Sequence, residues 1–557
     1  MFSTVTSQIS FVNFTDGNRV QMASSMIRQS QCLVNAELPL IIPENAFVRG
    51  QSFTVQLAPK DGQVIDKHNY AVVVKYNDDE EDVFILDDLF ECDLKIGDTF
   101  KKNDVIVRHK SYDPKYQLIK FGVNANVMFA VPEAKTHEDA VIITKHGQSL
   151  FEYEYPVKIV YELPAENTLI QVSPKLRPGM TFQTGEEILT ISKYSSSLAS
   201  LFNMQVNKDH ASLPFTVTNI FTYVDPKTNF LQYQPESTKK FFETFSTSYK
   251  KYDKQILQRY LKRSFSFDSS AFIVIYGVAR LLPKPGDKFA NLWGNKGVAS
   301  SVGEKEYHLY DRNYDIRMPI HVVHTPVGIP SRMNLGQVIY MSLGYLLKYV
   351  VPKKLISLKH LSDKVNFLVK FYATIDRKYA KKLVSLLKSL NEKQIKQMIS
   401  EIESEGFRII VSQFTYNMFE KIDKLYKELN VDPYFYCEEM NQMIGGGVIY
   451  TMLLEHLAFK KLKHTSYSSV DKKTLQPLDG QRMGEMEMWT LASYDALNFL
   501  KESLTIRSDD ILAKSKVISD LIRTGNSSLK TKLNPSTYLL FKAYMSLLGV
   551  EFLEDEE

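Results

Sequence analysis

Two lysines stand in the glycine-rich stretch 286–297, which reads Gly-Asp-Lys-Phe-Ala-Asn-Leu-Trp-Gly-Asn-Lys-Gly. Lys288 and Lys296 are each flanked by glycine and by Asp or Asn. Glycine lets a backbone approach a polyanion closely, and the lysine ammonium is a compact cation that suits phosphate oxygens. The stretch lacks the G-x-x-x-x-G-K-[ST] order of a P-loop, which argues against an ordinary NTPase site. The pattern indicates a loop that handles phosphate.

Arginines in two other blocks add a second kind of phosphate ligand. Arg19 lies in 16–29, Asp-Gly-Asn-Arg-Val-Gln-Met-Ala-Ser-Ser-Met-Ile-Arg-Gln, and Arg332 lies in 326–337, Pro-Val-Gly-Ile-Pro-Ser-Arg-Met-Asn-Leu-Gly-Gln. A guanidinium can grip phosphate oxygens through two parallel hydrogen bonds. The alternative for Arg332 is an ion pair inside the fold. A further block, 480–489, reads Gly-Gln-Arg-Met-Gly-Glu-Met-Glu-Met-Trp.

These four blocks, in this order, resemble the large β subunit of multisubunit, cellular-type DNA-dependent RNA polymerases. They match that subunit's DxNRxxM…MxRQ, GDK…GNKG, GxPSRMNxGQ and GQRxGEMExW segments. The resemblance begins almost at Met1, so the N-terminal half of the family's subunit has no counterpart here. It implies the C-terminal half of a split β subunit of bacterial type, most similar to those of giant, phiKZ-like bacteriophages.

The resemblance implies a role for each polar residue of these blocks. Arg19 and Arg332 would contact the phosphates of the incoming NTP. Lys288 and Lys296 would lie along the RNA 3′ end and the RNA–DNA hybrid, with Gln29 close to the growing end. Holding two reacting groups in register removes a large part of a bimolecular barrier.

Two residues outside these blocks also match the family. His464 would face the initiating nucleotide, although a lone histidine is more often structural than functional. Asp139, in the family's acidic FED segment, would support the second, NTP-borne Mg²⁺ through water, although adjacent acids are also common in surface turns. The family holds its first Mg²⁺ on an acidic NADFDGD loop of the β′ subunit. This chain has no such loop, so we expect it to be inactive alone.

Three segments depart from the family pattern. Leu292-Trp293 stand where the family has Arg-His, and Asn13-Phe14-Thr15 replace residues that are usually acidic or His. The segment 477–482 is shorter than the family's PLGGKAQFGGQR. Any contact that the family makes through the arginine of that Arg-His pair is therefore lost or supplied by a partner chain. The short segment 477–482 lacks a lysine-bearing loop that lies near the RNA–DNA hybrid in the family.

Apolar periodicity outlines the elements that must position these residues. Alternating runs such as 70–76 and 82–86 predict strands, and 271–282 predicts a buried strand leading into the lysine loop. Helices are expected over 237–262, from 336 to 349 and over much of 362–430. The last hundred residues predict at least three amphipathic helices. Their apolar positions are interpreted as core residues: Met486, Trp489, Leu497, Leu500 and Leu504.

The expected fold is mixed α/β and multidomain, with a β-rich, barrel- or sandwich-like hybrid-binding wall, a flap and a helical C-terminal clamp-docking region. The expected divisions are 1–150, a strand-rich part of the active-site wall; 151–270, a flap-like region; 271–352, the hybrid-binding core; 353–445, a helical insertion; and 446–557, the core return and clamp-docking helices.

Composition agrees with an ordinary globular protein. Of 557 residues, 44% are hydrophobic and 24% charged, and a net charge of +4 argues against a nucleic-acid-coating tail. The three cysteines are scattered, so neither a disulfide framework nor a Cys-rich zinc site is encoded. The sequence shows neither a signal peptide nor an apolar run of membrane-span length. We expect an intracellular protein, in the cytoplasm of an infected bacterial host, with packaging in the virion left open.

The resemblance also implies partners: a chain carrying the N-terminal half of β, β′-like chains, a promoter-specificity subunit, template DNA, RNA and Mg²⁺, with no membrane. Two alternatives compete. A catalytically inactive, polymerase-like scaffold would not need the cations and the acid together. A single-chain polymerase of the double-barrel silencing type would need the acidic metal loop in this chain.

Overall fold

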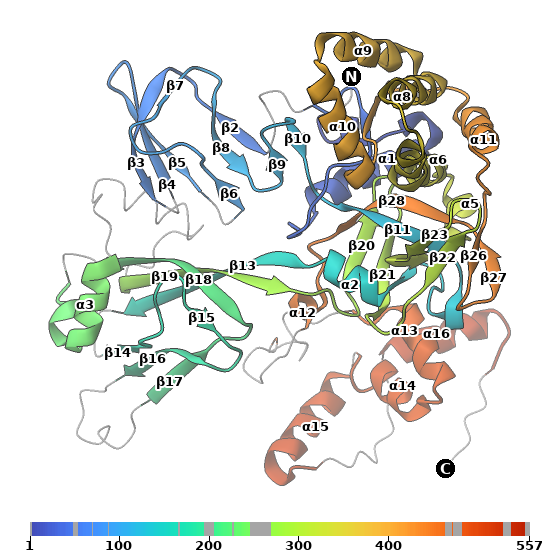
Figure 1. Cartoon of the computed structure of the whole chain (residues 1–557). Helices are drawn as coiled ribbons and strands as arrows, with labels where there is room; N and C mark the ends of the chain where they lie inside the picture. Colours follow the sequence, from blue (N-terminus) through green and yellow to red (C-terminus); the bar gives the residue numbers. More distant parts are fainter. Residues whose placement is uncertain are drawn as a thin grey trace. The chain divides into compact units, whose positions relative to one another are not determined.

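The computed structural model describes residues 3–47, 54–68, 71–86, 89–164, 168–193, 205–224, 228–245, 269–462, 471, 482–508, 510–526 and 536–551. The chain divides into two compact units, Met1–Ala458 and Phe459–Glu557, and both are drawn in Figure 1. The mixed α/β class expected from the sequence is confirmed.

The first unit contains a closed barrel of six strands in the order β11-β24-β12-β21-β20-β28 (Figure 1). Pairing is parallel between β11 and β24 and between β12 and β21, and antiparallel elsewhere. The barrel therefore gathers segments far apart in sequence, including those next to Asp139 and within the lysine loop. The six strands are β11 (Val123–Phe129), β12 (Ala140–Ile143), β20 (Lys288–Asn291), β21 (Lys296–Val302), β24 (Val322–His324) and β28 (Gly446–Leu453).

The two arginine blocks form helices. Asp16 caps α1 (Gly17–Arg28), its carboxylate accepting from the Asn18 backbone N–H at 3.1 Å. Arg332 ends α5 (Gly328–Arg332), and α6 (Gly336–Tyr345) packs against β28. A single π turn, η6 (Leu346–Val350), joins α6 to α7 (Val351–Ser357). The helix expected from 336 to 349 is confirmed, with this turn inside it.

The segment after α7 is largely helical, as expected over much of 362–430. Its helices are α8 (Leu361–Ile375), α9 (Arg377–Ser389), α10 (Glu392–Glu405) and α11 (Met418–Leu429). An Asn391–Gln394 capping box starts α10. Between α10 and α11, β25 (Ile409–Val411) pairs in parallel with β1 (Ile41–Pro43), which joins the helical segment to the N-terminal residues.

Two sheets and a helix form a separate hydrophobic cluster, in which the rings of Phe182 and Phe215 stack at 5.5 Å. The expected strand 271–282 is β19, and the expected helix over 237–262 is confirmed as far as Phe245 by α3; residues 246–262 lie outside the described residues. The sheets run β13-β19-β18-β15 and β14-β16-β17. Their elements are β13 (Tyr153–Pro164), β14 (Thr168–Val172), β15 (Thr181–Phe182), β16 (Glu187–Lys193), β17 (Gln205–His210), β18 (Phe215–Val224), β19 (Ser269–Leu281) and α3 (Glu236–Phe245).

The strands expected between 52 and 150 are also present. Two sheets run β5-β4-β3-β7 and β2-β8-β6, and a hairpin joins β9 to β10. Their bounds are β2 (Val55–Leu57), β3 (Gly62–His68), β4 (Ala71–Tyr76), β5 (Glu81–Ile85), β6 (Phe90–Glu91), β7 (Thr99–Phe100), β8 (Val105–His109), β9 (Tyr112–Asp113) and β10 (Leu118–Ile119). A last sheet runs β23-β22-β26-β27, with β22 (His308–Asp311), β23 (Ile316–Pro319), β26 (Phe435–Cys437) and β27 (Gln442–Ile444).

The second unit is helical where it is described, with α13 (Glu485–Ser493), α14 (Leu497–Leu504), α15 (Ile511–Thr524) and α16 (Ser536–Leu547). The interpretation of its apolar positions as core residues is wrong for most of them. Trp489 is 62% exposed, and Met486, Leu497 and Leu504 are also exposed. The sequence of an apolar helix face does not specify which surface packs against it. Among the described residues, no part of this chain buries these side chains.

Among the described residues, the structure has no helix long and apolar enough to span a lipid bilayer.

Candidate functional site

Arg332 is held by two partners from different parts of the chain. Its Nη2 forms a hydrogen-bonded ion pair with Asp139 Oδ1, and its Nη1 donates to Asn295 Oδ1 at 3.1 Å. The Arg332 side chain is 20% exposed and that of Asp139 is 48% exposed. The ion pair expected as the alternative for Arg332 is therefore present. The guanidinium is fixed in direction and still reaches the surface.

The position of Asp139 follows from a close approach of two backbones. The Val298 backbone N–H donates to the Asp139 carbonyl at 3.1 Å. A Cβ on Gly297 would lie 2.3 Å from the same carbonyl oxygen, so no other residue fits there without a shift. Gly297 of β21 thus allows the backbone of Asp139, directly before β12, to lie against the lysine loop.

A buried amide fixes the turn that contains Asn295. Asn291 Oδ1 accepts from the backbone N–H groups of Trp293 at 3.0 Å and Asn295 at 3.2 Å. Its Nδ2 donates to Gln337 Oε1 at 2.8 Å, which ties the turn to α6. Trp293 is fully buried and donates from Nε1 to the Ser10 carbonyl at 2.8 Å. The departure of Trp293 from the family pattern is therefore a core contact of this chain.

Arg19 lies against the same turn. Its Nη1 donates to the Gly294 carbonyl at 3.4 Å, and a Cβ on Gly294 would lie 2.5 Å from the Arg19 carbonyl. Gly294 has a φ of +73°, a left-handed conformation that favours glycine. Since Arg332 contacts the adjacent Asn295, the two predicted phosphate ligands meet neighbouring residues of one turn.

The two lysines share a face of the barrel sheet. Lys288 pairs with Val298 and Lys296 pairs with Ala290 on antiparallel β20 and β21. Directly paired residues project to the same side of a sheet, and so do residues two apart on one strand. Lys296 is exposed, and no ion pair involves it within the part of the chain that is described. Its ammonium is available to an external anion.

His456, which sequence analysis did not identify, contacts both Gln29 and Lys288. Gln29 ends α1, and its Oε1 lies 3.2 Å from His456 Nε2. The Lys288 backbone N–H donates to the His456 carbonyl at 3.2 Å, and that of Glu455 donates to the Gln29 carbonyl at 2.9 Å. His456 lies shortly after the end of β28, within an apolar stretch, and this was its one sequence signal. His464, the histidine that was predicted, lies outside the described residues.

Asp287 has a structural role beside Lys288. The Asp287 side chain is buried and accepts from the backbone N–H groups of Lys284 at 2.8 Å and Ala458 at 2.7 Å. These bonds fix the turn from which β20 starts. The aspartate of the Gly-Asp-Lys block therefore shapes the backbone that presents Lys288.

The described residues do not form a Mg²⁺ site by themselves. Asp139 is bound to Arg332, and Asn295 Oδ1 already accepts from the same guanidinium. Mg²⁺ needs near-octahedral oxygen ligation, and among the described residues no group of three His, Cys, Asp or Glu could hold a metal. One engaged carboxylate does not meet that need.

Comparison with known proteins places the chain among RNA polymerase subunits. Residues 5–483 match the model of RNA polymerase Rpb2, domain 6, and residues 479–552 match that of domain 7. The chain is 27% identical over 556 residues to a DNA-directed RNA polymerase subunit beta of Mycoplasmopsis synoviae, covering 93% of this chain and 40% of that protein. It is 29% identical over 289 residues to the same subunit of Anaeromyxobacter sp., covering 49% of this chain and 20% of that one. The chain thus spans well under half the length of these relatives.

Proposed function

Because the chain belongs to the RNA polymerase Rpb2 family, we propose that it is the C-terminal part of a split β subunit of a bacterial-type, multisubunit DNA-dependent RNA polymerase. In this proposal it forms one wall of a nucleotidyl-transfer site and has no activity alone. The observation that carries the proposal is the arrangement around one turn, where Arg332, Asn295 and Arg19 meet beside the exposed Lys296.

Arg332 suits the phosphates of an incoming NTP. Its guanidinium is already oriented by Asn295 and Asp139, so little side-chain entropy is lost when phosphate oxygens bind. Asp139 holds the cation in place, and the triphosphate competes with it for the outer N–H groups. Arg19 contacts Gly294, the neighbouring residue of the same turn. Charge neutralisation of the triphosphate is one of the main needs of phosphoryl transfer.

Lys288 and Lys296 suit the RNA strand. They lie on one face of β20 and β21, and successive backbone phosphates can contact two cations placed along a sheet. Gln29, linked to Lys288 through His456, adds an amide close to the same strand. The role of this face is to hold the RNA 3′ end in register with the NTP. His464 belongs to the same proposal as a contact of the initiating nucleotide.

The remaining parts of a polymerase belong to other chains in this proposal. A chain with the N-terminal half of β and β′-like chains complete the enzyme, and β′ supplies the carboxylates that hold Mg²⁺. Asp139 reaches the second Mg²⁺ only through water. A promoter-specificity subunit, template DNA and RNA complete the assembly. The proposed organisation is that of phiKZ-like bacteriophages, in the cytoplasm of the infected bacterium.

One observation favours a second candidate, an inactive polymerase-like scaffold. Arg332 is neutralised within the chain by Asp139, and a guanidinium that serves only the fold would look the same. In that case Lys296 would be a solvated surface charge.

RNA extension on a preformed RNA–DNA scaffold separates the two, using complexes purified by a tag on this chain. We expect Mg²⁺-dependent extension that collapses with Arg332→Ala and with Lys296→Ala in fully assembled complexes. Matched controls are Arg317→Ala and Lys393→Ala, because both residues are exposed and outside this site. Extension that survives both site variants, or that is missing from an intact wild-type complex, would favour the scaffold.

A further inference from the structure

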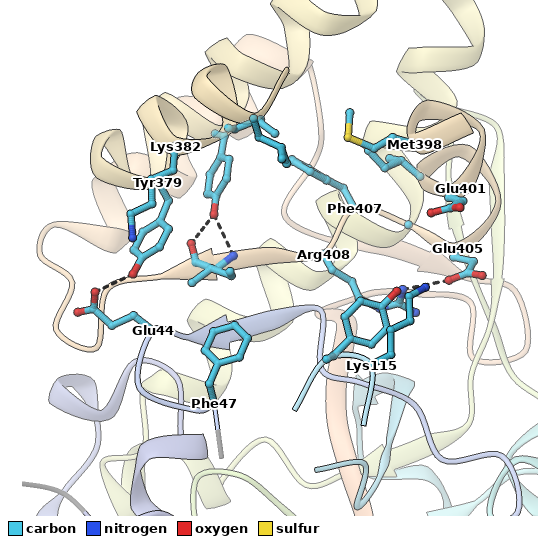
Figure 2. A pocket seen from close by; sticks show the side chains of 17 residues that line it. Glu44, Phe47, Lys115, Tyr379, Lys382, Met398, Glu401, Glu405, Phe407 and Arg408 are labelled. Atoms are coloured by element: carbon cyan, nitrogen blue, oxygen red, sulfur yellow. Dashed lines mark hydrogen bonds and ion pairs between the residues drawn. The ribbon is translucent and has the colours of Figure 1, made fainter. Parts of the chain in front are cut away.

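A large cavity lies away from the candidate site, between α9, α10 and the β1–β25 pair (Figure 2). Its volume is about 920 Å³, at the upper end of the roughly 300–1,000 Å³ that is usual for ligand pockets. Figure 2 shows Tyr379 and Lys382 on one wall and Met398, Glu401 and Glu405 on the other, with Phe407 between them. We call this cavity the α9–α10 groove.

The two helices present the same pattern to the α9–α10 groove. The lining residues of α9 are Tyr379, Lys382, Leu383 and Leu386, and those of α10 are Met398, Glu401, Ile402 and Glu405. Both sets follow the spacing i, i+3, i+4, i+7, which is one face of an α-helix. Leu386 is 50% exposed, so part of the apolar lining faces solvent. Each helix thus turns a stripe of mixed apolar and charged side chains to the groove, and two such stripes suit the face of a third, amphipathic helix.

The floor of the groove excludes addition of a strand. Ile409 donates to Leu40 and Glu44 donates to Val411, so these residues of β25 face β1. The backbone N–H and carbonyl of Ile410 point away from β1, and the Tyr372 hydroxyl binds both of these groups. It accepts from the Ile410 N–H at 2.9 Å and donates to the Ile410 carbonyl at 2.5 Å. An occupant must therefore bind through side chains.

The charges around the groove favour an acidic occupant. Three acids line the groove, and each has a partner: Glu44 pairs with Lys378 at 2.6 Å, Glu405 pairs with Arg408 at 3.0 Å, and Glu401 accepts from Gln397 Nε2 at 3.1 Å. The Lys382 ammonium lies 4.5 Å from the centre of the Tyr379 ring rather than on a carboxylate.

Helix α9 itself carries five Lys or Arg residues and no acid. Among the described residues, no ion pair involves four of them: Arg377, Lys381, Lys382 and Lys388. Basic side chains beside an apolar groove are complementary to an amphipathic helix with an acidic face.

We infer that the α9–α10 groove docks an acidic amphipathic helix from another polypeptide. Aliphatic or aromatic side chains of that helix enter between Leu386 and Met398, and its carboxylates contact Lys382 and the neighbouring cations of α9. The apolar residues that line the groove favour protein side chains over a nucleic-acid backbone, which would need an open cationic surface. This inference does not depend on catalysis at the candidate site.

Site-specific photo-crosslinking in the intact complex tests the inference. Leu386→p-benzoylphenylalanine places the probe in the groove, and Ile356→p-benzoylphenylalanine is the control, because Ile356 is also exposed, on α7, but does not line the groove. We expect a light-dependent protein adduct at position 386 that mass spectrometry maps to a Glu- or Asp-rich helical segment. Lys382→Glu should lower the adduct yield on the order of ten-fold, which corresponds to one charge contact.

The matched charge reversal Lys393→Glu, on the same helical pair but outside the groove, should leave the yield unchanged. Several outcomes would overturn the inference. These are no light-dependent adduct at position 386, an adduct with RNA or DNA, an adduct on a segment without acidic residues, and a yield that Lys382→Glu does not alter.

Discussion

The side-chain amide of Asn291 donates to Gln337 at 2.8 Å, and both residues are buried. This single bond joins the lysine loop to the helix that follows Arg332. Gln337 in turn donates to Asn334 Oδ1 at 2.8 Å, so three amides form one chain. The two blocks of polar residues thus share an internal support.

Gln337→Leu should destabilise the fold and loosen the turn at Asn295. The change leaves Asn291 Nδ2 buried without an acceptor, which costs about 1–3 kcal/mol. Urea unfolding of the purified chain would measure the loss. The control is Gln397→Leu, an exposed residue of α10 whose amide donates to Glu401. Equal midpoints for the two variants would show that the amide chain contributes nothing.

Gly297→Ala should displace Asp139. The new Cβ would lie 2.3 Å from the Asp139 carbonyl, and overpacking of this kind costs about 1–3 kcal/mol. Extension by the assembled complex should fall with it, because Asp139 orients Arg332. Gly17→Ala is the control, since nothing lies within 4 Å of a Cβ at that position. A Gly297→Ala complex as active as the control would contradict the placement.

Arg332 and Asp139 should be energetically coupled. In a double-mutant cycle of Arg332→Ala and Asp139→Ala, the KM for NTP should rise in each single variant and no further in the double variant. Groups in contact show coupling of about 0.5–3 kcal/mol. Arg332→Lys should rescue poorly, because lysine lacks the planar fork that contacts two partners. Additive effects of the two alanine changes would show that Asp139 does not act through Arg332.

Acid should destabilise the chain through buried histidines. Burial lowers the pKa of His321 from 6.5 to about 3, and the nearby cation Lys348 adds to the effect; burial also lowers the pKa of His324 to about 4. Between these values and 6.5 the unfolded chain binds more protons than the folded chain. The free energy of unfolding therefore falls as pH drops below about 6.5, by up to about 1.4 kcal/mol per pH unit for each histidine.

Urea unfolding between about pH 7 and pH 5 measures this dependence. His321→Asn should remove about 2 kcal/mol of the acid-induced loss over that range. The exposed His360, changed to Asn, is the control. If His321→Asn retains the full pH dependence of the natural chain, His321 does not carry it.

Much of the secondary structure was predictable, because several segments with apolar periodicity form the expected helices and strands. The strand at 271–281 and the helices α6 and α8–α11 follow directly from apolar spacing. The order of the barrel strands did not follow, since β11 pairs with β28 across more than half of the chain. Non-local pairing leaves no periodic trace in a single sequence.

The charged residues of the candidate site could be identified from the sequence, but the polar residues that hold them in place could not. Arg332, Asp139 and Lys296 belong to recognisable blocks, whereas Asn291, Gln337 and His456 are ordinary polar residues until the fold brings them together. The apolar positions of α13 and α14 were interpreted wrongly for a related reason. Periodicity identifies an apolar helix face that packs against another surface. It does not show whether that surface belongs to this chain or to a partner.

The order of the barrel strands determines when each strand can pair while the chain is being synthesised. β11 and β20 leave the ribosome early, and both pair with β28, which is the last barrel strand to be made. At usual elongation rates, roughly 15 s to about a minute separates Phe129 from Gly446. During that time β11, joined later by β20, presents unpaired backbone groups along an apolar strand, which favours aggregation. The nascent chain should therefore depend on chaperones until residue 453 has emerged.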